Sequence, residues 1–197
     1  MTKADETRKH IIKKAAPIFN MYGYDGFSLS LLTEAIGMTK GAVYGNFKNK
    51  DELSRAAFEY NFSITSNQIA AVVGTRKNSC DKLIAYAGFY IDYFQAACDK
   101  GGCPVLNAAI DTDNKDLPAR TSVLAAIDTW LSSIIQIINK GKKKGEIKPH
   151  ADPAEFASLF VTSIEGAMML SKVTSDPIHL ERAANHLIDL VNKELRA

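Results

Sequence analysis

At 197 residues, the chain can hold one or two small domains with a sizeable core. Hydrophobic residues make up 46% and charged residues 23%, which is typical of a globular protein, and the net charge is only +2. Nine Lys or Arg and seven Asp or Glu residues fall within residues 1–60. Any affinity for DNA must therefore come from the placement of a few cations and not from bulk charge.

The N-terminus is polar, so we expect no signal peptide, and no apolar run approaches the roughly 20 residues that a membrane helix needs. The three cysteines, Cys80, Cys98 and Cys103, are odd in number and lack the spacing of a zinc site. A reducing cytoplasm is therefore the expected location, and we expect no metal, no cofactor and no membrane partner.

Residues 2–22 are predicted to form the first helix, because apolar side chains recur there at helical spacing. These are Ile12, Ala15, Ala16 and Phe19. Pro17 lies inside this helix and is expected to kink it near residues 13–16, since proline lacks a backbone donor. Gly23 and Gly26 then mark the connection to the next element.

Residues 28–47 are predicted to form two short helices joined by a tight turn. Ser28 and Thr39 have side chains that can cap the start of each helix. Gly37 suits the left-handed conformation that a sharp reversal requires. Apolar side chains at helical spacing give the two helices their inner faces: Leu29, Leu32, Ile36, Val43 and Phe47. This shape is a helix-turn-helix, whose second helix enters the DNA major groove, although a helical hairpin that does not bind DNA has the same outline.

The run Asn49-Lys50-Asp51-Glu52 is a capping box that predicts the start of a long helix ending near Val73. Residues 111–116 are predicted to be a polar connection. Further helices are predicted between glycine, proline and acidic capping signals: 81–98, 104–110, 118–139, 153–173 and 177–195. Because the sequence has no strand pattern, the predicted fold class is all-α, with about nine helices, three of them in an N-terminal head.

A specific combination of residues surrounds the predicted helix-turn-helix: Phe19, Gly23, Tyr24, Lys40, Gly41, Tyr44, Phe47, Lys50 and Leu53. With this combination, residues 8–55 resemble the N-terminal DNA-binding domain of the TetR/AcrR family of bacterial transcriptional regulators. The rest of the chain resembles that family only in helix layout. The resemblance implies a DNA-binding domain over residues 1–48 and a larger helical domain for ligand binding and dimerisation over residues 49–197.

The resemblance and the docking mode of a helix-turn-helix indicate eight candidate DNA-binding residues: Ser28, Ser30, Thr39, Lys40, Gly41, Tyr44, Lys48 and Lys50. Thr39 and Lys40 begin the second hairpin helix, and Tyr44 lies one turn further on. Ser28 and Thr39 are expected to act as caps in any case. Three positions depart from the residue types usual in the family and leave the operator sequence unpredicted: Leu31, Thr33 and Gly45.

In the family, a small molecule binds in a cavity of the larger domain. Candidate ligand contacts are aromatic, polar or sulfur-containing side chains on otherwise apolar helices: Tyr86, Tyr90, Asn107, Trp130, Thr162, Glu165 and Met169. Ordinary core packing is the alternative explanation for the aromatic ones. The resemblance also predicts a dimer interface on the last two helices, which carry small and aliphatic residues on one side: Ala157, Val161, Ile164, Met168, Ala184, Leu187 and Val191.

We therefore predict a ligand-responsive transcriptional regulator, a repressor that binds a pseudo-palindromic DNA operator as a homodimer and is released by a small-molecule effector. The alternative is a DNA-binding regulator without such an inducer, which is constitutive, controlled by a partner protein or thiol-sensing through Cys98 and Cys103. An enzyme is not predicted, because the sequence has no Gly-rich phosphate loop, no metal-spaced His, Cys or Glu set and no GxSxG motif.

Overall fold

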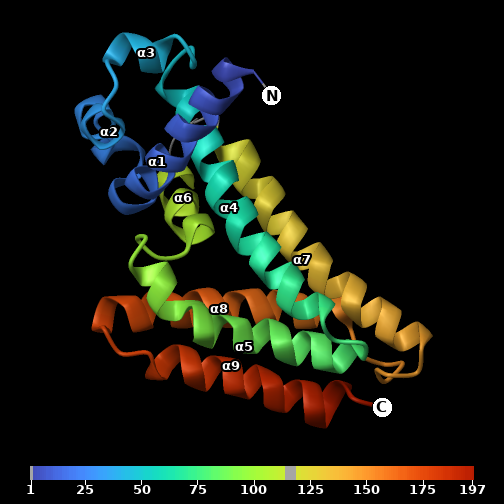
Figure 1. The fold of residues 1–197 in the computed structure, drawn as a ribbon. Coiled ribbons are helices and arrows are strands. Elements are labelled where there is room, and N and C mark those ends of the chain that lie inside the picture. The colour runs from blue at the N-terminus through green and yellow to red at the C-terminus, as the bar shows by residue number, and fades with distance from the viewer. Residues whose placement is uncertain (1, 114–118) are drawn as a thin grey trace. The chain divides into compact units, whose positions relative to one another are not determined.

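The computed structural model describes residues 2–113 and 119–197 (Figure 1). The helices found in these ranges are α1 (Lys3–Gly26), α2 (Leu29–Ile36), α3 (Lys40–Tyr44), α4 (Lys50–Gly74), α5 (Ser79–Cys98), α6 (Pro104–Asp113), α7 (Ala119–Lys143), α8 (Pro153–Thr174) and α9 (Ile178–Leu190). A π-helical segment, Val191–Leu195, follows α9, and Ile147 and Arg196 form an isolated antiparallel bridge. The predicted all-α fold is confirmed.

Several predicted helix boundaries differ from the structure, and two of the differences change what an element contains. α6 continues to Asp113, so it includes the start of the predicted polar connection, while the predicted helix start at residue 118 lies outside the described residues. The final α-helix ends at Leu190, and the π-helical turn after it occupies the remainder of the predicted 177–195 helix. Apolar periodicity cannot distinguish these, because a wider helical turn at the end of a helix keeps apolar side chains on nearly the same face.

The chain folds as two compact units. The first comprises Met1–Thr65 with Lys100–Ala126, and the second comprises Ser66–Asp99 with Ile127–Ala197. The predicted head, residues 1–48, lies entirely within the first unit. That unit also holds α6 and the beginnings of α4 and α7, because α6 packs on α1.

The head is organised around a small core from α1 to α4. Its buried side chains are Ile11, Ala15, Ala16, Phe27, Leu32, Val43, Phe47, Leu53 and Ala57. The rings of Phe19 and Phe27 stack with centroids 3.8 Å apart. Since α2 and α3 are too short to be stable alone in water, this shared core is what keeps them helical.

Glycine 23, and not the region before Pro17, is where α1 departs from helical geometry. Gly23 has φ 68° and ψ −178°, a backbone conformation that residues other than glycine rarely adopt. A Cβ at this position would lie 2.8 Å from the Asp111 carboxylate. The kink expected near residues 13–16 is therefore replaced by a break at Gly23, about two helix turns further on, where α1 meets α6.

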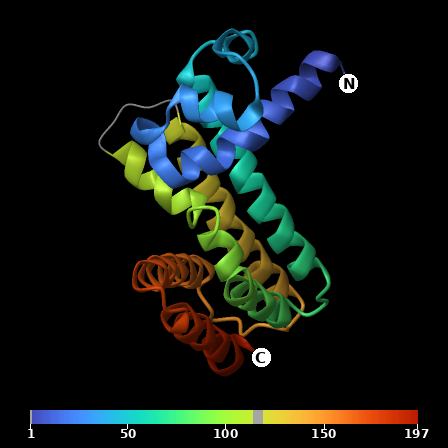
Figure 2. The ribbon, with the colours of Figure 1, turned by 60° about the vertical axis from the view of Figure 1, so that its left-hand side comes forward.

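In the second unit, α9 lies beside both α5 and α8 (Figures 1 and 2). The core of the second unit is made of fully buried side chains from these three helices and from α7: Leu83, Ile134, Ile138, Phe160, Ile164, Leu180 and Leu187. Asp152 caps α8 through the amides of Ala154 and Glu155, as its sequence predicts, and Pro153 occupies the first helical position.

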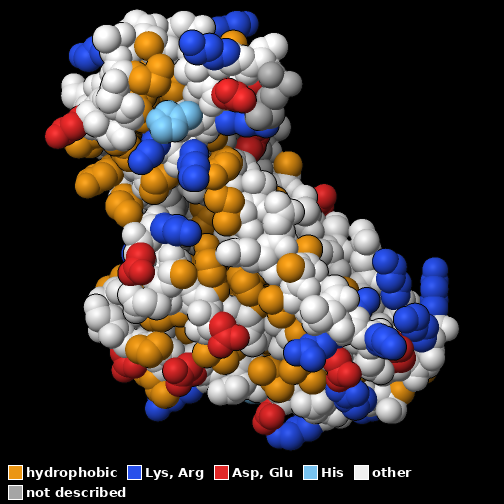
Figure 3. Space-filling model, viewed as in Figure 1, with side chains coloured by type: hydrophobic (Ala, Val, Ile, Leu, Met, Phe, Trp, Pro, Cys, Tyr) orange, Lys and Arg blue, Asp and Glu red, His pale blue; other side chains and the backbone are white. Residues whose placement is uncertain are grey.

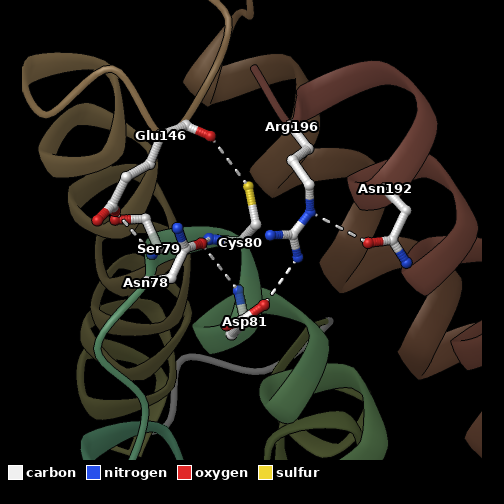
Figure 4. A network of polar contacts seen from close by, with 7 residues as sticks. All are labelled: Asn78, Ser79, Cys80, Asp81, Glu146, Asn192 and Arg196. Atoms are coloured by element: carbon white, nitrogen blue, oxygen red, sulfur yellow. Dashed lines mark hydrogen bonds and ion pairs between the residues drawn. The ribbon is translucent and has the colours of Figure 1, made fainter.

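The C-terminal residues are held by a polar network at the start of α5 (Figure 4). Arg196 pairs with Asp81 at 2.7 Å and also donates to Asn192. The Ala197 amide donates to the Glu146 carbonyl at 3.2 Å, and the Ser79 amide donates to the Glu146 carboxylate at 2.8 Å. These contacts join the end of the chain, the α7–α8 connection and α5.

Two helices meet the length and composition expected of a membrane span, which corrects the expectation that no apolar run is long enough. They are α7 and α8. In α8, seven residues spread along the helix are buried against its neighbours, including Phe156, Phe160 and Ile164. Buried core helices of water-soluble proteins have the same length and apolar composition. The correction therefore concerns the length of the apolar segments and does not indicate a membrane span.

Basic side chains gather where α7 ends, and blue side chains are visible at that place in Figure 3. Lys140, Lys142 and Lys143 occupy the last turn. Cations are favourable there because the carbonyl end of a helix carries partial negative charge. Lys142 also donates to the Ala151 carbonyl at 2.8 Å.

We expect Gly141→Ala to lower the free energy of unfolding by about 1–3 kcal/mol. The added Cβ would lie 2.7 Å from both the Ile147 side chain and the Ser79 Cβ, so the α7–α8 connection would have to move. Urea denaturation measures the change. Gly88→Ala is the matched control, because its Cβ meets nothing within 4 Å and alanine favours a helix; that variant should be unchanged or more stable.

Candidate nucleic-acid interface

The helix-turn-helix has the local geometry that its sequence predicts. The Ser28 hydroxyl oxygen accepts a hydrogen bond from the Leu31 amide at 3.1 Å, and the Thr39 hydroxyl accepts from the Ala42 amide at 3.2 Å. Gly37 ends α2 in the left-handed conformation, with φ 65°. Each capping hydroxyl uses an oxygen lone pair for the cap, so its proton remains available for a phosphate.

α3 turns one face to the core and the other to solvent. Val43 and Phe47 are buried at 1% and 2% exposure, whereas Tyr44 is 52% exposed. Lys40 and Gly41 lie on the exposed side of the same helix. The short helix is therefore anchored from within while its candidate DNA-binding side chains are free to approach a groove.

The remaining candidates divide by exposure. Ser30 and Lys48 are exposed, and Ser28 is half-buried. Lys50 is also half-buried, and its ammonium donates to the Phe27 carbonyl at 3.2 Å and lies 4.4 Å from the centre of the Tyr24 ring. The structure thus gives Lys50 a role inside the head, and its predicted contact with DNA remains a prediction.

Arg8 holds the end of α3 and was not among the residues predicted from sequence. Its guanidinium donates to the Asn46 carbonyl and pairs with Glu52 at 2.7 Å. The same group lies 4.1 Å from the centre of the Phe47 ring. No local motif could have indicated this, because Arg8 is separated by 38 and 44 residues from Asn46 and Glu52.

The capping box at the start of α4 is only partly as predicted. The Glu52 amide donates to the Asn49 side chain at 2.9 Å, which confirms half of it. The Glu52 carboxylate accepts from the Lys48 amide at 2.8 Å and not from Asn49. The Lys48 amide and the Arg8 guanidinium both lower the pKa of Glu52.

A second contact fixes the same region from the other side. The Tyr24 hydroxyl donates to the Asp51 carboxylate, and this bond raises the pKa of Tyr24 to about 12. Since the Tyr24 ring also supports the Lys50 ammonium, the first turn of α4 is tied to the end of α1.

Two family models match the chain, and together they cover the head and the larger helical part. The model described as "Bacterial regulatory proteins, tetR family" matches residues 11–57. The model described as "Tetracyclin repressor-like, C-terminal domain" matches residues 79–187, more than half of the chain. The chain belongs to the TetR family of transcriptional regulators. It is therefore a DNA-binding regulator of a non-enzymatic family, as the sequence predicts.

Solved structures of other TetR-family regulators agree with this fold over the whole chain. A regulator from Cytophaga hutchinsonii is 33% identical with a TM-score of 0.94, covering 100% of this chain and 98% of that one. A regulator from Chloroflexus aurantiacus J-10-FL is 34% identical with a TM-score of 0.90, covering 100% and 99%. The transcriptional repressor DhaR of Mycobacterium sp. (strain GP1) is 23% identical over 84% of this chain and 82% of its own length.

Three of the ligand candidates of this TetR-family chain come together in the second unit. Tyr86 and Tyr90 have ring centroids 6.2 Å apart, and Tyr90 and Trp130 have centroids 5.7 Å apart. All three are at most 6% exposed. The Tyr86 hydroxyl lies 3.2 Å from the Ser133 hydroxyl, and burial raises the pKa of Tyr86 to about 12. Within the described residues, the buried Trp130 indole N–H has no hydrogen-bond acceptor.

The other ligand candidates do not join this aromatic cluster (Tyr86, Tyr90 and Trp130). Asn107 lies in the first unit, where its amide donates to the Asn20 and Gly101 carbonyls. Thr162 and Met169 are exposed on α8. Glu165 is half-buried on the same helix. The apolar spacing in the sequence predicts that these residues lie on apolar helices. It does not predict which face of α8 is buried against the rest of the chain.

The dimer face predicted on the last two helices also needs correction. Ala157, Ile164 and Met168 are buried within the chain, as are Ala184 and Leu187 of α9. The sequence predicts that each helix has an apolar face, but it does not predict which surface packs against that face. In the structure, other helices of the same chain pack against it.

Neither the buried Cys80 nor the half-buried Cys98 lies in an environment that favours a reactive thiolate. The Cys80 thiol donates to the Glu146 carbonyl at 3.4 Å, and burial raises the pKa of this thiol. Burial also raises the pKa of Cys98. Because the thiolate is the reactive form, these shifts argue against the thiol-sensing alternative at Cys98.

We expect the head to lose stability in acid partly through Glu52. Its pKa is lowered in the folded state, so its stabilising contribution is present above the ordinary value of 4.5 and is lost as the pH falls through the lower folded value. Glu52→Gln should flatten the loss of thermal stability below about pH 4.5, measured by circular dichroism. Glu34→Gln, an exposed change on α2, should keep the wild-type profile; an equal flattening there would contradict the assignment.

Proposed function

We propose that this TetR-family regulator is a repressor that binds a pseudo-palindromic operator as a dimer and is released by a small molecule. The observation that carries the DNA-binding part is the exposed face of α3. Thr39, Lys40 and Tyr44 lie on that face, while Val43 and Phe47 anchor the opposite one. This is the arrangement in which a recognition helix reads the major groove.

Repression and intracellular action are proposed from the relatives. DhaR and the Escherichia coli protein ComR, which is 25% identical over 81% of this chain, are both named transcriptional repressors. A repressor acts where the chromosome is, so we propose a cytoplasmic location.

Dimerisation is supported by an apolar stripe along α8. Four exposed apolar side chains follow helical spacing on one face, Leu159, Met169, Leu170 and Val173, and Thr162 and Gly166 lie between them on that face. Val173 is 78% exposed, and a contiguous set of exposed apolar side chains such as this one is typical of a protein–protein contact. A second copy of the chain is the proposed partner, since one short recognition helix reads too few bases for useful specificity.

Effector binding is proposed in the second unit, at the aromatic cluster. The unpaired indole N–H of Trp130 would donate to an acceptor group on a ligand, with Tyr90 stacking beside it. The alternative is a regulator without an inducer. An effector that raises the melting temperature and weakens operator binding would distinguish the two.

We expect Lys40→Ala and Tyr44→Ala each to weaken binding to a duplex selected from a random library by about 10-fold or more. Each change removes a side chain from the exposed face of α3, so thermal stability should stay within a few degrees of wild type. Fluorescence anisotropy at several salt concentrations measures both affinity and salt slope. Lys82→Ala removes the same charge from α5 and should leave affinity unchanged. Equal affinities for all four proteins would refute the proposed interface.

We expect Val173→Glu with Leu170→Glu to shift the chain from dimer to monomer at micromolar concentration. The two charges would be buried unpaired in the proposed interface, which opposes association. Light scattering after size exclusion gives the mass. Leu124→Glu is the control, because Leu124 is 55% exposed in the first unit and lies off the stripe. A wild-type monomer would exclude the proposed dimer.

A further inference from the structure

Exposed cations of the second unit gather where two chain connections meet. The α4–α5 connection packs against the end of α7, because a Cβ at Gly141 would lie 2.7 Å from the Ser79 Cβ. The Ser79 amide also donates to the Glu146 carboxylate at 2.8 Å. Blue side chains cover the end of α7 in Figure 3. The five exposed cations of these two segments form what we call the basic cluster: Arg76, Lys77, Lys140, Lys143 and Lys144.

Carboxylates beside the basic cluster are already engaged by other groups. Asp81 pairs with Arg196 at 2.7 Å, and Glu146 accepts from the Ser79 amide. Lys144 approaches Glu146 only to 3.9 Å, with 56% of its side chain exposed. The negative charge in these segments is therefore directed at the fold, while the cluster faces solvent.

Helix ends do not account for the basic cluster either. α4 and α7 end here, and α5 and α8 begin here, since the Lys142 ammonium reaches the Ala151 carbonyl just before α8. Partial charges at helix C-termini and N-termini have opposite signs, so those of the four ends largely cancel. The Lys144 amide donates to the Lys140 carbonyl at 3.2 Å, which places these two cations one helical turn apart. Like charges at that spacing oppose folding, and an external anion would relieve the repulsion.

The basic cluster also contrasts with the charge of the rest of the chain. The chain has 24 Lys and Arg residues against 22 Asp and Glu residues. Without the five cations of the cluster, acidic residues would exceed basic ones by three. An anionic partner would therefore be attracted to a local surface such as this one and not to the chain as a whole.

The residue types of the basic cluster favour the backbone of duplex DNA as the partner. Residues 74–82 and 139–150 contain no Phe, Tyr or Trp, and Ile147 is buried. The surface therefore offers no apolar group for insertion into a membrane and no ring on which unpaired bases could stack. Four of the five cations are lysines, which contact phosphates as point charges on flexible stems. Duplex DNA presents one such charge for about every 1.7 Å of its axis.

We propose that the basic cluster is a second DNA-binding surface, which contacts the phosphates of duplex DNA independently of base sequence. It is distinct from the exposed face of α3, because the cluster belongs to the second unit and α3 to the first. Phosphate contacts raise the affinity for every duplex and do not discriminate between sequences. The proposal requires neither the operator nor the effector of the proposed function.

Fluorescence anisotropy with a duplex of arbitrary sequence tests this surface in the full chain. Lys40→Ala with Tyr44→Ala serves as the background, because it removes the exposed face of α3. In that background, Lys140→Gln with Lys143→Gln should weaken binding by about 5-fold or more at low salt and reduce the salt slope by about 2. An unchanged affinity or an unchanged slope would overturn the proposal.

A second pair and a matched control locate the effect. Arg76→Gln with Lys77→Gln, in the α4–α5 connection, should reproduce the loss. Lys100→Gln with Arg120→Gln removes the same charge from exposed positions of the first unit and should change affinity less than about 2-fold. An equal loss in this control would assign the effect to net charge and overturn the proposal. All of these side chains are exposed, so melting temperatures should stay within a few degrees of the background.

Vesicles of phosphatidylcholine with phosphatidylserine distinguish DNA from a membrane surface. Both cluster variants should lose affinity for the duplex while vesicle binding stays weak. Binding to these vesicles that depends on the cluster and is tighter than binding to the duplex would overturn the assignment to DNA.

The duplex selected from a random library separates this proposal from the proposed function. In the wild-type chain, the cluster variants should weaken the selected and the arbitrary duplex by the same factor and leave the ratio of the two affinities unchanged. A changed ratio would contradict a contact with phosphates alone. Lys40→Ala with Tyr44→Ala should lower the ratio. A wild-type chain that binds both duplexes equally would refute the α3 interface and leave the basic cluster in place.

Discussion

The structure depends most on what holds α3 in place. This helix has five residues, far fewer than an isolated helix needs to be stable in water. Its orientation comes from two buried side chains, Val43 and Phe47, and from the Arg8 guanidinium, which bonds to the Asn46 carbonyl and pairs with Glu52. Because Arg8 comes from α1 and Glu52 from α4, the exposed face of α3 is fixed only when both flanking helices are in place.

The same logic applies where α1 meets α6. Asn20 donates to the Lys100 and Gly102 carbonyls, and Asn107 donates back to the Asn20 carbonyl. Gly101 can have no side chain, since a Cβ would lie 2.9 Å from the Asn20 carbonyl oxygen. Amide side chains are suited to this join because each carries donors and an acceptor, and so satisfies backbone groups at a buried turn.

The sequence could predict features whose causes are local. Ser28 and Thr39 act as caps, and Gly37 has the left-handed conformation, because these depend on residues within one turn. Contacts over long separations could not be predicted, and Arg8 with Glu52 and Asp111 with Tyr24 are of this kind. The predicted dimer face shows a different limit. Apolar residues at helical spacing, such as Ile164, indicate that one face of the helix is buried. The spacing is the same whether that face packs against the same chain or against a second subunit.

The use of charge explains how a nearly neutral chain can bind DNA. Arg8 and Lys50 are engaged within the head, where they hold α3 and the start of α4. Lys40 and Lys48 are the lysines among the eight candidates that remain exposed. Each phosphate contact contributes through counterion release, so these two candidate lysines alone would give weak and salt-sensitive binding. Useful affinity would then require two heads on one operator. Arg8 and Lys50 would contribute indirectly, because their contacts within the head fix the orientation of the helices that carry the exposed lysines. In this proposal, affinity comes from exposed side chains that are already held in the binding orientation, and not from a high density of positive charge. Because each head has few such side chains, the proposal requires a dimer.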